Sequence, residues 1–213
     1  MKQIKLDLDN TEEALNDAAK ILQDGGVIIY PTDTLYGLGA NAFNENAVLK
    51  IYKIKKQDRN KPISVIVKDL KMARKIACLD SKVEKILNKI WPGPITIVLR
   101  KKDIISDVLT GNGETVAIRI PDNEFISALM EKVDFPITAT SANISGEKDL
   151  LKSEEIIRKF KFAKIKPDLF IDAGDIKNAQ ASTIIDLTTG IPKIIRTGIV
   201  GKDEIKKFFG KFI

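Results

Sequence analysis

The sequence predicts an α/β fold: a single domain with a large twisted mixed β-sheet flanked by helices. Short apolar segments typical of buried strands alternate along the chain with longer segments whose apolar residues recur at helical spacing. Hydrophobic residues make up 44% of the 213 positions and charged residues 30%, which supplies both a large core and a charged surface. No long linker, repeat or low-complexity segment interrupts the alternation, so residues 1–213 are expected to form one domain.

The N-terminal part of the chain predicts a strand, a helix and a second strand. Residues Met1–Asp7 alternate between apolar and polar side chains, as a strand does. Asn10 is a favoured N-cap residue, and apolar side chains recur at helical spacing through Thr11–Gln23 until Gly25-Gly26 ends the helix. The uninterrupted apolar segment Val27–Tyr30 then predicts a buried strand.

The middle of the chain continues with helices and strands separated by turns. Glu45–Lys55 carries apolar residues at helical spacing, and Lys61-Pro62 ends the loop that follows it. The turn Trp91–Pro94 is rigid because it contains two prolines, and it precedes the apolar strand Ile95–Leu99. The same criteria predict a strand at Ile63–Val67 and helices at Leu70–Ala77 and Lys82–Ile90.

The last part of the chain departs from strict alternation of strands and helices. Leu169–Arg196 contains three apolar strands and no helical pattern, which indicates a mixed sheet with antiparallel members. The strands expected after residue 100 are Thr115–Ile120, Pro136–Thr140, Leu169–Asp172, Thr183–Leu187 and Lys193–Arg196. The helices expected there are Asn123–Val133, Ser153–Phe160 and Asp203–Phe208.

Composition excludes several classes of protein. No apolar run approaches the ~20 residues of a membrane helix, and the N-terminus lacks the apolar region of a secretory signal, so a cytoplasmic location is expected. The chain contains no histidine, which rules out Cys/His zinc sites and the usual Ser-His-Asp and Cys-His triads. The single cysteine, Cys78, cannot form an internal disulfide and is expected to be buried in a helical stretch.

Two polar segments, each directly after an apolar strand, are candidates for a binding site. Pro31–Gly39 offers hydroxyls, a carboxylate, a phenol and two glycines, and Thr138–Gly146 offers four hydroxyls and the amide of Asn143. Each pattern alone also fits a capped turn, with Asp33 as the capping residue of the first. Because ligands of α/β folds bind in loops beyond strand ends, two such segments favour a site for an oxygen-rich ligand.

A basic stretch between a predicted helix and a predicted strand adds positive charge to this expectation. Residues 53–61 contain Lys53, Lys55, Lys56, Arg59 and Lys61 against one acidic residue, within a net charge of +6. The basic segments at 158–166 and in the last eighteen residues are interpreted as solvated surface. Neither a Gly-x-x-x-x-Gly-Lys-Ser/Thr nor a Gly-x-Gly-x-x-Gly motif is present, which disfavours P-loop NTPases and dinucleotide-binding Rossmann folds.

Catalysis without histidine depends on positioning and on cations that stabilise phosphate charge, as in phosphoryl and nucleotidyl transfer. Lys55, Lys61, Arg119 and Arg196 lie beside predicted strand or loop ends and are the candidate cations. The sequence therefore predicts an enzyme site for an anionic nucleotide.

Several segments, in order along nearly the whole chain, resemble the signature of the YrdC-like threonylcarbamoyl-AMP synthases. These segments are Gly26–Gly39, Trp91–Thr96, Val116–Pro121, Thr140–Gly146, Ser182–Asp186 and Ile195–Gly198. The resemblance implies the single-domain form of the family, with a twisted mixed sheet, flanking helices and a basic concave face. It also implies a nucleotidyltransferase that joins L-threonine, bicarbonate and ATP into threonylcarbamoyl-AMP, with release of pyrophosphate, for threonylcarbamoyladenosine modification of tRNA.

The resemblance also assigns residues to the two ends of the site. Threonine would contact Thr34, Arg119 and Ser182, with Arg119 on the carboxylate. ATP would contact Lys55, Gln57, Lys61, Thr115, Ser141, Asn143 and Arg196. Mg²⁺ is expected to be held mainly by the ATP phosphates, and no residue is assigned as a metal ligand or as catalytic. The candidate macromolecular partners are tRNA or double-stranded RNA and a downstream threonylcarbamoyl-transferase complex.

One position departs from the family pattern. Where the family reads Lys-x-Arg, this chain reads Lys55-Lys56-Gln57, so a neutral amide replaces a cation expected at the triphosphate. One hypothesis is that Lys56 or Arg59 supplies the missing charge. Two other readings stay open: a non-catalytic RNA-binding module of the same fold, and a relative that transfers a carbamoyl group to another acceptor. Only 6% of residues are aromatic, and no RRM-like stacking motif occurs, which disfavours base-specific readout.

Overall fold

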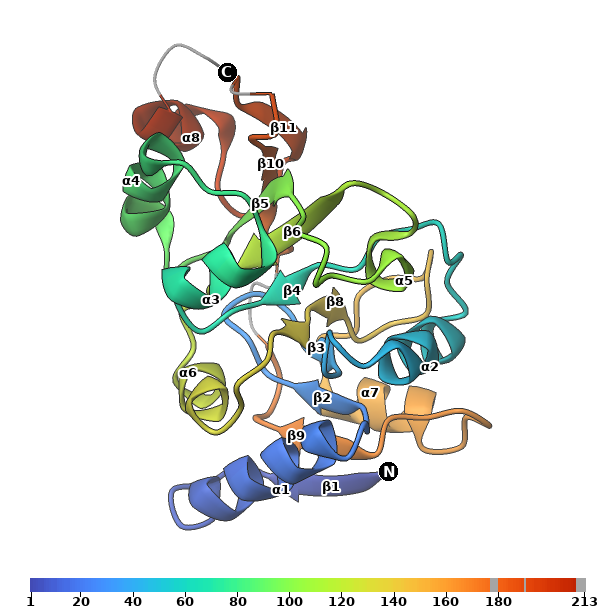
Figure 1. Cartoon of the computed structure of the whole chain (residues 1–213). Coiled ribbons are helices and arrows are strands. Elements are labelled where there is room, and N and C mark those ends of the chain that lie inside the picture. The colour runs from blue at the N-terminus through green and yellow to red at the C-terminus, as the bar shows by residue number, and fades with distance from the viewer. Residues whose placement is uncertain (177–179, 190, 210–213) are drawn as a thin grey trace.

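The fold contains two mixed β-sheets with helices packed around them (Figure 1). The computed structural model describes residues 1–176, 180–189 and 191–209. One sheet has five strands, in the spatial order β1 (Lys2–Lys5), β9 (Leu169–Asp172), β2 (Ile28–Tyr30), β3 (Gly37–Gly39) and β8 (Thr140–Ser141). The other has six, in the order β11 (Lys193–Arg196), β10 (Thr183–Asp186), β5 (Ile95–Arg100), β6 (Thr115–Arg119), β4 (Val65–Ile66) and β7 (Ile137–Thr138).

The helices agree closely with the sequence pattern. They are α1 (Thr11–Gln23), α2 (Glu45–Lys55), α3 (Leu70–Ile76), α4 (Ser81–Ile90), α5 (Asp107–Thr110), α6 (Glu124–Glu131), α7 (Ser153–Phe160) and α8 (Lys202–Phe209). Of the helices in the described part of the chain, the short helix α5 alone has no counterpart among those expected from the sequence. Among the described residues, none of the helices has both the length and the apolar character needed to cross a membrane.

The α/β class and the mixed strand directions are confirmed, but the expected single large sheet is divided in two. The two sheets meet at the segment expected as one strand over Pro136–Thr140, which pairs with a different sheet at each end. Its first part, β7, pairs antiparallel with β4, and its second part, β8, pairs antiparallel with β3. Where the partner changes, the amide of Thr138, the last residue of β7, donates to the carbonyl of Ala40. The amide of the next residue, Ala139, donates to the carbonyl of Ser64. This crossing segment places the second polar loop at the seam between the two sheets.

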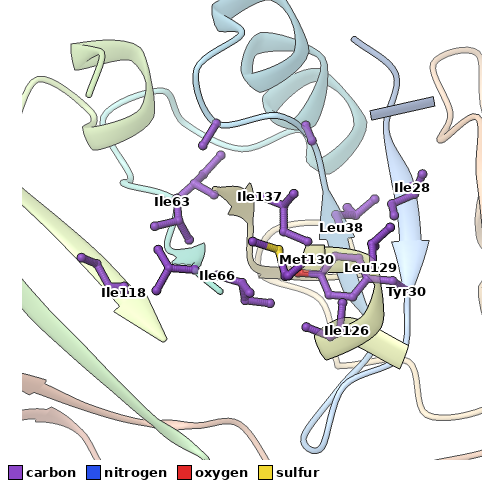
Figure 2. Close-up of a cluster of buried hydrophobic side chains, with 14 of the residues drawn as sticks. Ile28, Tyr30, Leu38, Ile63, Ile66, Ile118, Ile126, Leu129, Met130 and Ile137 are labelled. Carbon is purple, nitrogen blue, oxygen red and sulfur yellow. The ribbon is translucent and has the colours of Figure 1, made fainter. Parts of the chain in front are cut away.

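One hydrophobic core serves both sheets. Figure 2 shows Ile126, Leu129 and Met130 of α6 against side chains of β2 and β3, among them Tyr30. Ile137 lies between that group and isoleucines from the other sheet. Every one of these side chains is buried, so the two sheets are fixed relative to each other by shared apolar contacts.

Two local expectations are wrong. Asn10 occupies the N-cap of α1 without making a side-chain cap bond; its Oδ1 instead accepts from the amide of Asp7. Cys78 is exposed rather than buried, because α3 ends at Ile76 and the extended Ala77 then forms a β-bridge that carries the cysteine out of the helix.

A glycine of β3 gives the first testable prediction. A Cβ at Gly37 would lie 2.6 Å from Cζ of Tyr30, whose ring is fully buried and whose hydroxyl donates to the carbonyl of Thr138. Gly37→Ala is therefore expected to lower the free energy of unfolding by about 1–3 kcal/mol in urea denaturation, through overpacking. Gly201→Ala is the control, since a Cβ there meets nothing within 4 Å. Equal effects of the two substitutions would contradict the packing described for Tyr30.

Candidate active site

A cavity of about 590 Å³ lies over one face of the six-stranded sheet. Its floor includes alternate residues of neighbouring strands, such as Thr96 and Val98 of β5 and Ala117 and Arg119 of β6, because side chains at every second position share a face. Its walls come from both predicted polar loops and from the basic stretch after α2. The three segments singled out in the sequence thus meet at one site.

Nearly all residues expected at the site line this cavity. They are Thr34, Lys55, Gln57, Lys61, Arg119, Ser141, Asn143, Ser182 and Arg196. Thr115 is the exception, because it lies at the other end of β6, opposite Arg100. Arg119 lies four positions further along the strand than Thr115, a rise of roughly 13 Å at about 3.3 Å per residue. The structure therefore does not bring Thr115 into the lining.

Arg119 is buried and held by three partners at one end of the cavity. Its Nε donates to the carbonyl of Gly93 at 2.8 Å, one terminal nitrogen to the hydroxyl of Thr34 at 2.8 Å, and the other to Asp33 at 2.5 Å. Burial lowers the pKa of Arg119, and the charge of Asp33 opposes this shift. A guanidinium has five N–H donors, so two remain for a ligand.

The role of Asp33 was not foreseen in the sequence, where it was interpreted as a turn residue. Its carboxylate is the ion-pair partner of Arg119, and both side chains are largely buried. Its second oxygen accepts from the amide of Asp122 at 3.3 Å. A carboxylate in a polar loop was visible in the sequence, but its partner lies 86 positions away, on a strand whose pairing only the fold reveals.

Lys55 anchors the second polar loop. Its ammonium, at the C-terminal end of α2, donates to the carbonyl of Ser141 at 2.5 Å and to the carbonyl and Oδ1 of Asn143 at 2.9 and 2.8 Å. The hydroxyl of Ser141 donates to the same Oδ1. Three acceptors match the three donors of an ammonium group, so Lys55 and the loop form one rigid unit.

Arg196 holds the far end of the cavity floor. Its guanidinium donates to the carbonyl of Ser182 at 2.8 Å and to the hydroxyl of Ser182 at 3.2 Å. That hydroxyl also lies 2.8 Å from the hydroxyl of Thr96, a buried residue that the sequence did not single out. Burial lowers the pKa of Arg196, and the charge of Asp149 opposes the shift.

The basic residues that line the cavity differ from the two, Lys56 and Arg59, that the sequence suggested as substitutes for the missing arginine. Lys61 and Gln57 line the cavity, whereas Lys56 and Arg59 do not. Lys56 adopts a left-handed conformation, φ 49°, as it ends α2, and its side chain is exposed. The Nε2 of Gln57 donates to the carbonyl of Lys61 at 3.1 Å. Of the five basic residues in this stretch, Lys55 and Lys61 line the cavity.

Burial of Lys55 gives a prediction for stability against pH. Desolvation, with a smaller contribution from nearby Lys61, lowers the pKa of Lys55 from 10.5 to about 8. Between pH 8 and 10.5 the unfolded chain therefore holds a proton that the folded chain has released, and folding stability rises with pH. From pH 7.5 to 9.5 the free energy of unfolding of wild type should rise by about 2 kcal/mol relative to Lys55→Met, measured by urea denaturation. A constant difference between the two proteins would contradict the lowered pKa.

Fold and site together define an α/β protein with a cavity over one sheet face that is lined by buried cations and hydroxyls, a lining whose chemistry suits small polar anions. The chain belongs to the Sua5–YciO–YrdC family: the family's sequence model, described as telomere recombination, matches residues 20–198. The family resemblance of the sequence motifs is thereby confirmed.

Similar proteins agree with this membership. The threonylcarbamoyl-AMP synthase of Pyrococcus abyssi is 35% identical over 195 residues, which cover 91% of this chain and 56% of that protein. A putative threonylcarbamoyl-AMP synthase of Methanocaldococcus jannaschii is 38% identical over 200 residues, with 94% and 93% covered. The crystal structure of P. abyssi Sua5 complexed with L-threonine superposes with a TM-score of 0.90 at 32% identity, covering 99% of this chain and 61% of that one. This chain thus spans little more than half of the P. abyssi protein.

Proposed function

We propose that the chain is an L-threonylcarbamoyladenylate synthase, which joins L-threonine, bicarbonate and ATP into threonylcarbamoyl-AMP and pyrophosphate. The observation that carries the proposal is a single cavity with Arg119 and Thr34 at one end and the Lys55–Asn143 unit at another. Synthases of this name at 35–38% identity support it. The product would serve threonylcarbamoyladenosine modification of tRNA. Contact of the protein with RNA or with a transferase complex stays a prediction. The basic concave face of the fold also stays a prediction.

Threonine is proposed to bind beside Arg119. The two remaining N–H groups of the guanidinium suit a carboxylate, which accepts two parallel hydrogen bonds. The Thr34 hydroxyl accepts from Arg119 and lies 3.0 Å from the hydroxyl of Thr32, which donates its own proton to the carbonyl of Leu35. Thr34 is therefore the donor to Thr32 and keeps one lone pair as an acceptor for a ligand. Asp33 acts here as a positioning residue, since it touches Arg119 and not the substrate.

ATP is proposed to enter as its magnesium complex at the end of the cavity formed by Lys55, Ser141 and Asn143. Among the described residues no group of three or more Asp, Glu, Cys or His side chains is placed to hold a metal ion. Mg²⁺ is therefore proposed to be coordinated mainly by the ATP phosphates and water. Lys61 and Arg196 line the same cavity and would face the triphosphate. Two separate ends allow the amino acid and the nucleotide to bind together, which in-line attack requires.

The chemistry needs positioning more than a protein base. The threonine ammonium first loses a proton to solvent. The neutral amine then forms a bond to the carbon of bicarbonate, and the departing hydroxide takes a second proton from the nitrogen and leaves as water. An oxygen of the resulting carbamate then attacks the α-phosphate, and pyrophosphate leaves with its negative charge stabilised by cations. Lys55, Lys61 and Arg196 supply those cations.

The test of the proposal is a pyrophosphate assay with purified protein, ATP, Mg²⁺, bicarbonate and L-threonine. Release that requires threonine is the expected result. Release that is unchanged when threonine is omitted, or the absence of release at any protein concentration, would overturn the proposal. L-Serine is a matched control substrate, since it lacks only the methyl group of threonine.

Gln57 gives a further prediction for this activity. Gln57→Arg is expected to lower the KM for ATP several-fold, because a guanidinium at the cavity wall adds a charge-assisted hydrogen bond to phosphate. Lys61→Ala should raise that KM, whereas Lys56→Ala and Arg59→Ala should leave it unchanged, since neither side chain lines the cavity. An increase of KM in Lys56→Ala or Arg59→Ala equal to that in Lys61→Ala would contradict the assignment of Lys61.

A further inference from the structure

A second cavity, of about 890 Å³, lies between α4, the end of α8 and the end of β5. Figure 1 shows α4 and α8 side by side, at the end of the molecule opposite α1. The second cavity shares no lining residue with the candidate active site. Along β5, Val98 lines the candidate active site and the next residue, Leu99, lines the second cavity, because successive side chains of a strand point to opposite faces. The two cavities therefore lie on opposite faces of the six-stranded sheet.

Much of the lining of the second cavity is apolar. α4 contributes Val83 and Ile86, which are only half-buried although they belong to the apolar side of the helix. Phe209 of α8 is buried at the same cavity. The other apolar lining residues are Leu79, Leu99, Leu187, Ile191 and Pro192. A concave apolar surface that the fold leaves partly exposed suits the apolar part of a ligand.

Positive charge gathers at one side of the second cavity, around Cys78. The amide of Cys78 donates to the carbonyl of Arg100 at 2.9 Å, so the cysteine and the arginine lie on neighbouring extended segments. Lys102 lies two positions beyond Arg100, and Lys82 is in the first turn of α4. All three cations and Cys78 line the cavity. The lining is therefore apolar along α4 and α8 and cationic where β5 ends and α4 begins.

This positive charge is not balanced within the second cavity. Asp80 is the acidic residue of the described lining, and its Oδ1 accepts from the amides of Lys82 and Val83, both at 2.8 Å, as the N-cap of α4. Three cations, Lys82, Arg100 and Lys102, against one carboxylate leave a balance of 3 − 1 = +2. In the described part of the chain no salt bridge involves any of the three. An anion bound here would gain Coulomb attraction without displacing an existing ion-pair partner.

We propose that the second cavity binds a small amphipathic anion: a carboxylate with an apolar chain. Its head group lies beside Arg100 and Cys78, and its chain lies against α4 and Phe209. The volume falls within the range of about 300–1,000 Å³ that is typical of small-molecule sites, which are mostly apolar with a few polar groups that fix orientation. An inorganic anion would leave the apolar wall uncovered, and an uncharged chain would leave the cations without a partner. The site is additional to the proposed synthase reaction, none of whose substrates carries an apolar chain.

The single cysteine of the chain is a direct reporter of this site, because Cys78 is exposed and lines the cavity. The rate at which N-ethylmaleimide alkylates Cys78 is measured with increasing sodium decanoate, below the concentration at which decanoate forms micelles. At a decanoate concentration of about ten times Kd the rate should fall about tenfold, because only the unoccupied fraction reacts. Alkylation of glutathione in the same solutions corrects for effects on the reagent itself.

Two control ligands separate the contributions of the chain and the charge. Acetate has the carboxylate without the chain, and decyltrimethylammonium has a chain of similar length with the opposite charge. Both should protect Cys78 far less than decanoate does. The absence of protection by decanoate in the full chain, or equal protection by decyltrimethylammonium, would overturn the proposal.

A substitution at the cationic side tests the position of the head group. Arg100→Gln keeps a long polar side chain at the exposed end of β5, and it is expected to raise the Kd for decanoate about fivefold, the effect of losing one partly exposed ion pair. Lys85→Gln is the matched control, since Lys85 is an exposed lysine of α4 outside the lining, and its Kd should equal that of wild type. Equal increases in the two variants, or none in Arg100→Gln, would contradict the proposed site. These measurements need neither ATP nor threonine, so they stand apart from the pyrophosphate assay.

Discussion

Arg119→Met is expected to abolish threonine-dependent pyrophosphate release and to lower the free energy of unfolding by about 3–5 kcal/mol. Methionine fills much of the same volume but leaves Asp33 as a largely buried carboxylate without its ion-pair partner. An uncompensated buried charge strongly destabilises the folded state. It also removes the donors proposed for the threonine carboxylate, along with those to Thr34 and to the carbonyl of Gly93. Urea denaturation and the pyrophosphate assay measure the two effects separately.

A second substitution separates the structural from the functional part of this effect. Adding Asp33→Asn to Arg119→Met removes the unpaired charge and should restore stability in large part, because a neutral amide costs less to bury than a carboxylate. Activity should stay absent, since the guanidinium is still missing. Recovery of threonine-dependent activity in the double variant would show that Arg119 acts only through the fold.

Lys55→Met is expected to reduce pyrophosphate release by about a hundredfold or more at saturating threonine. Three charge-assisted hydrogen bonds, each contributing about 1.5–3 kcal/mol, join this ammonium to the Ser141–Asn143 loop and hold the loop in place at the proposed nucleotide end. Its positive charge is proposed to stabilise the phosphates through space rather than by a direct hydrogen bond. The KM for ATP should rise while the KM for threonine stays close to that of wild type, because the threonine end does not contact Lys55.

Lys50→Met is the matched control for Lys55→Met. Lys50 lies on the same helix, and its ammonium pairs with Asp168 at 2.6 Å outside the cavity. Its removal should leave turnover unchanged. A loss of activity in Lys50→Met comparable to that in Lys55→Met would point to general damage to α2 and contradict the proposed role of Lys55.

The sequence was most informative where structure is local. The bounds of α1, α2 and α7 match the expected helices residue for residue, because apolar spacing acts within a few positions, helped in α1 by the glycines that follow it. The polar loops were recognised for the same reason, since each follows a buried strand directly. These local signals were enough to identify two of the segments that line the cavity.

Features that depend on distant pairing were not predicted. The division into two sheets follows from Ile137–Ser141 pairing first with β4 and then with β3, and nothing in the apolar pattern of that strand specifies a change of partner. The ion pair of Asp33 and the hydroxyl of Thr96 depend on which strands lie side by side. Thr115 was carried over by motif, and the length of β6 places it outside the lining.

The most direct test of the account is the product itself. Wild-type protein is incubated with ATP, Mg²⁺, L-threonine and carbon-13 bicarbonate, and the quenched mixture is analysed by liquid chromatography and mass spectrometry. The account predicts an adenylate that contains threonine and carries the carbon-13 label, formed in step with pyrophosphate and absent in Arg119→Met. AMP or an unlabelled adenylate in place of that product, with pyrophosphate released all the same, would contradict it.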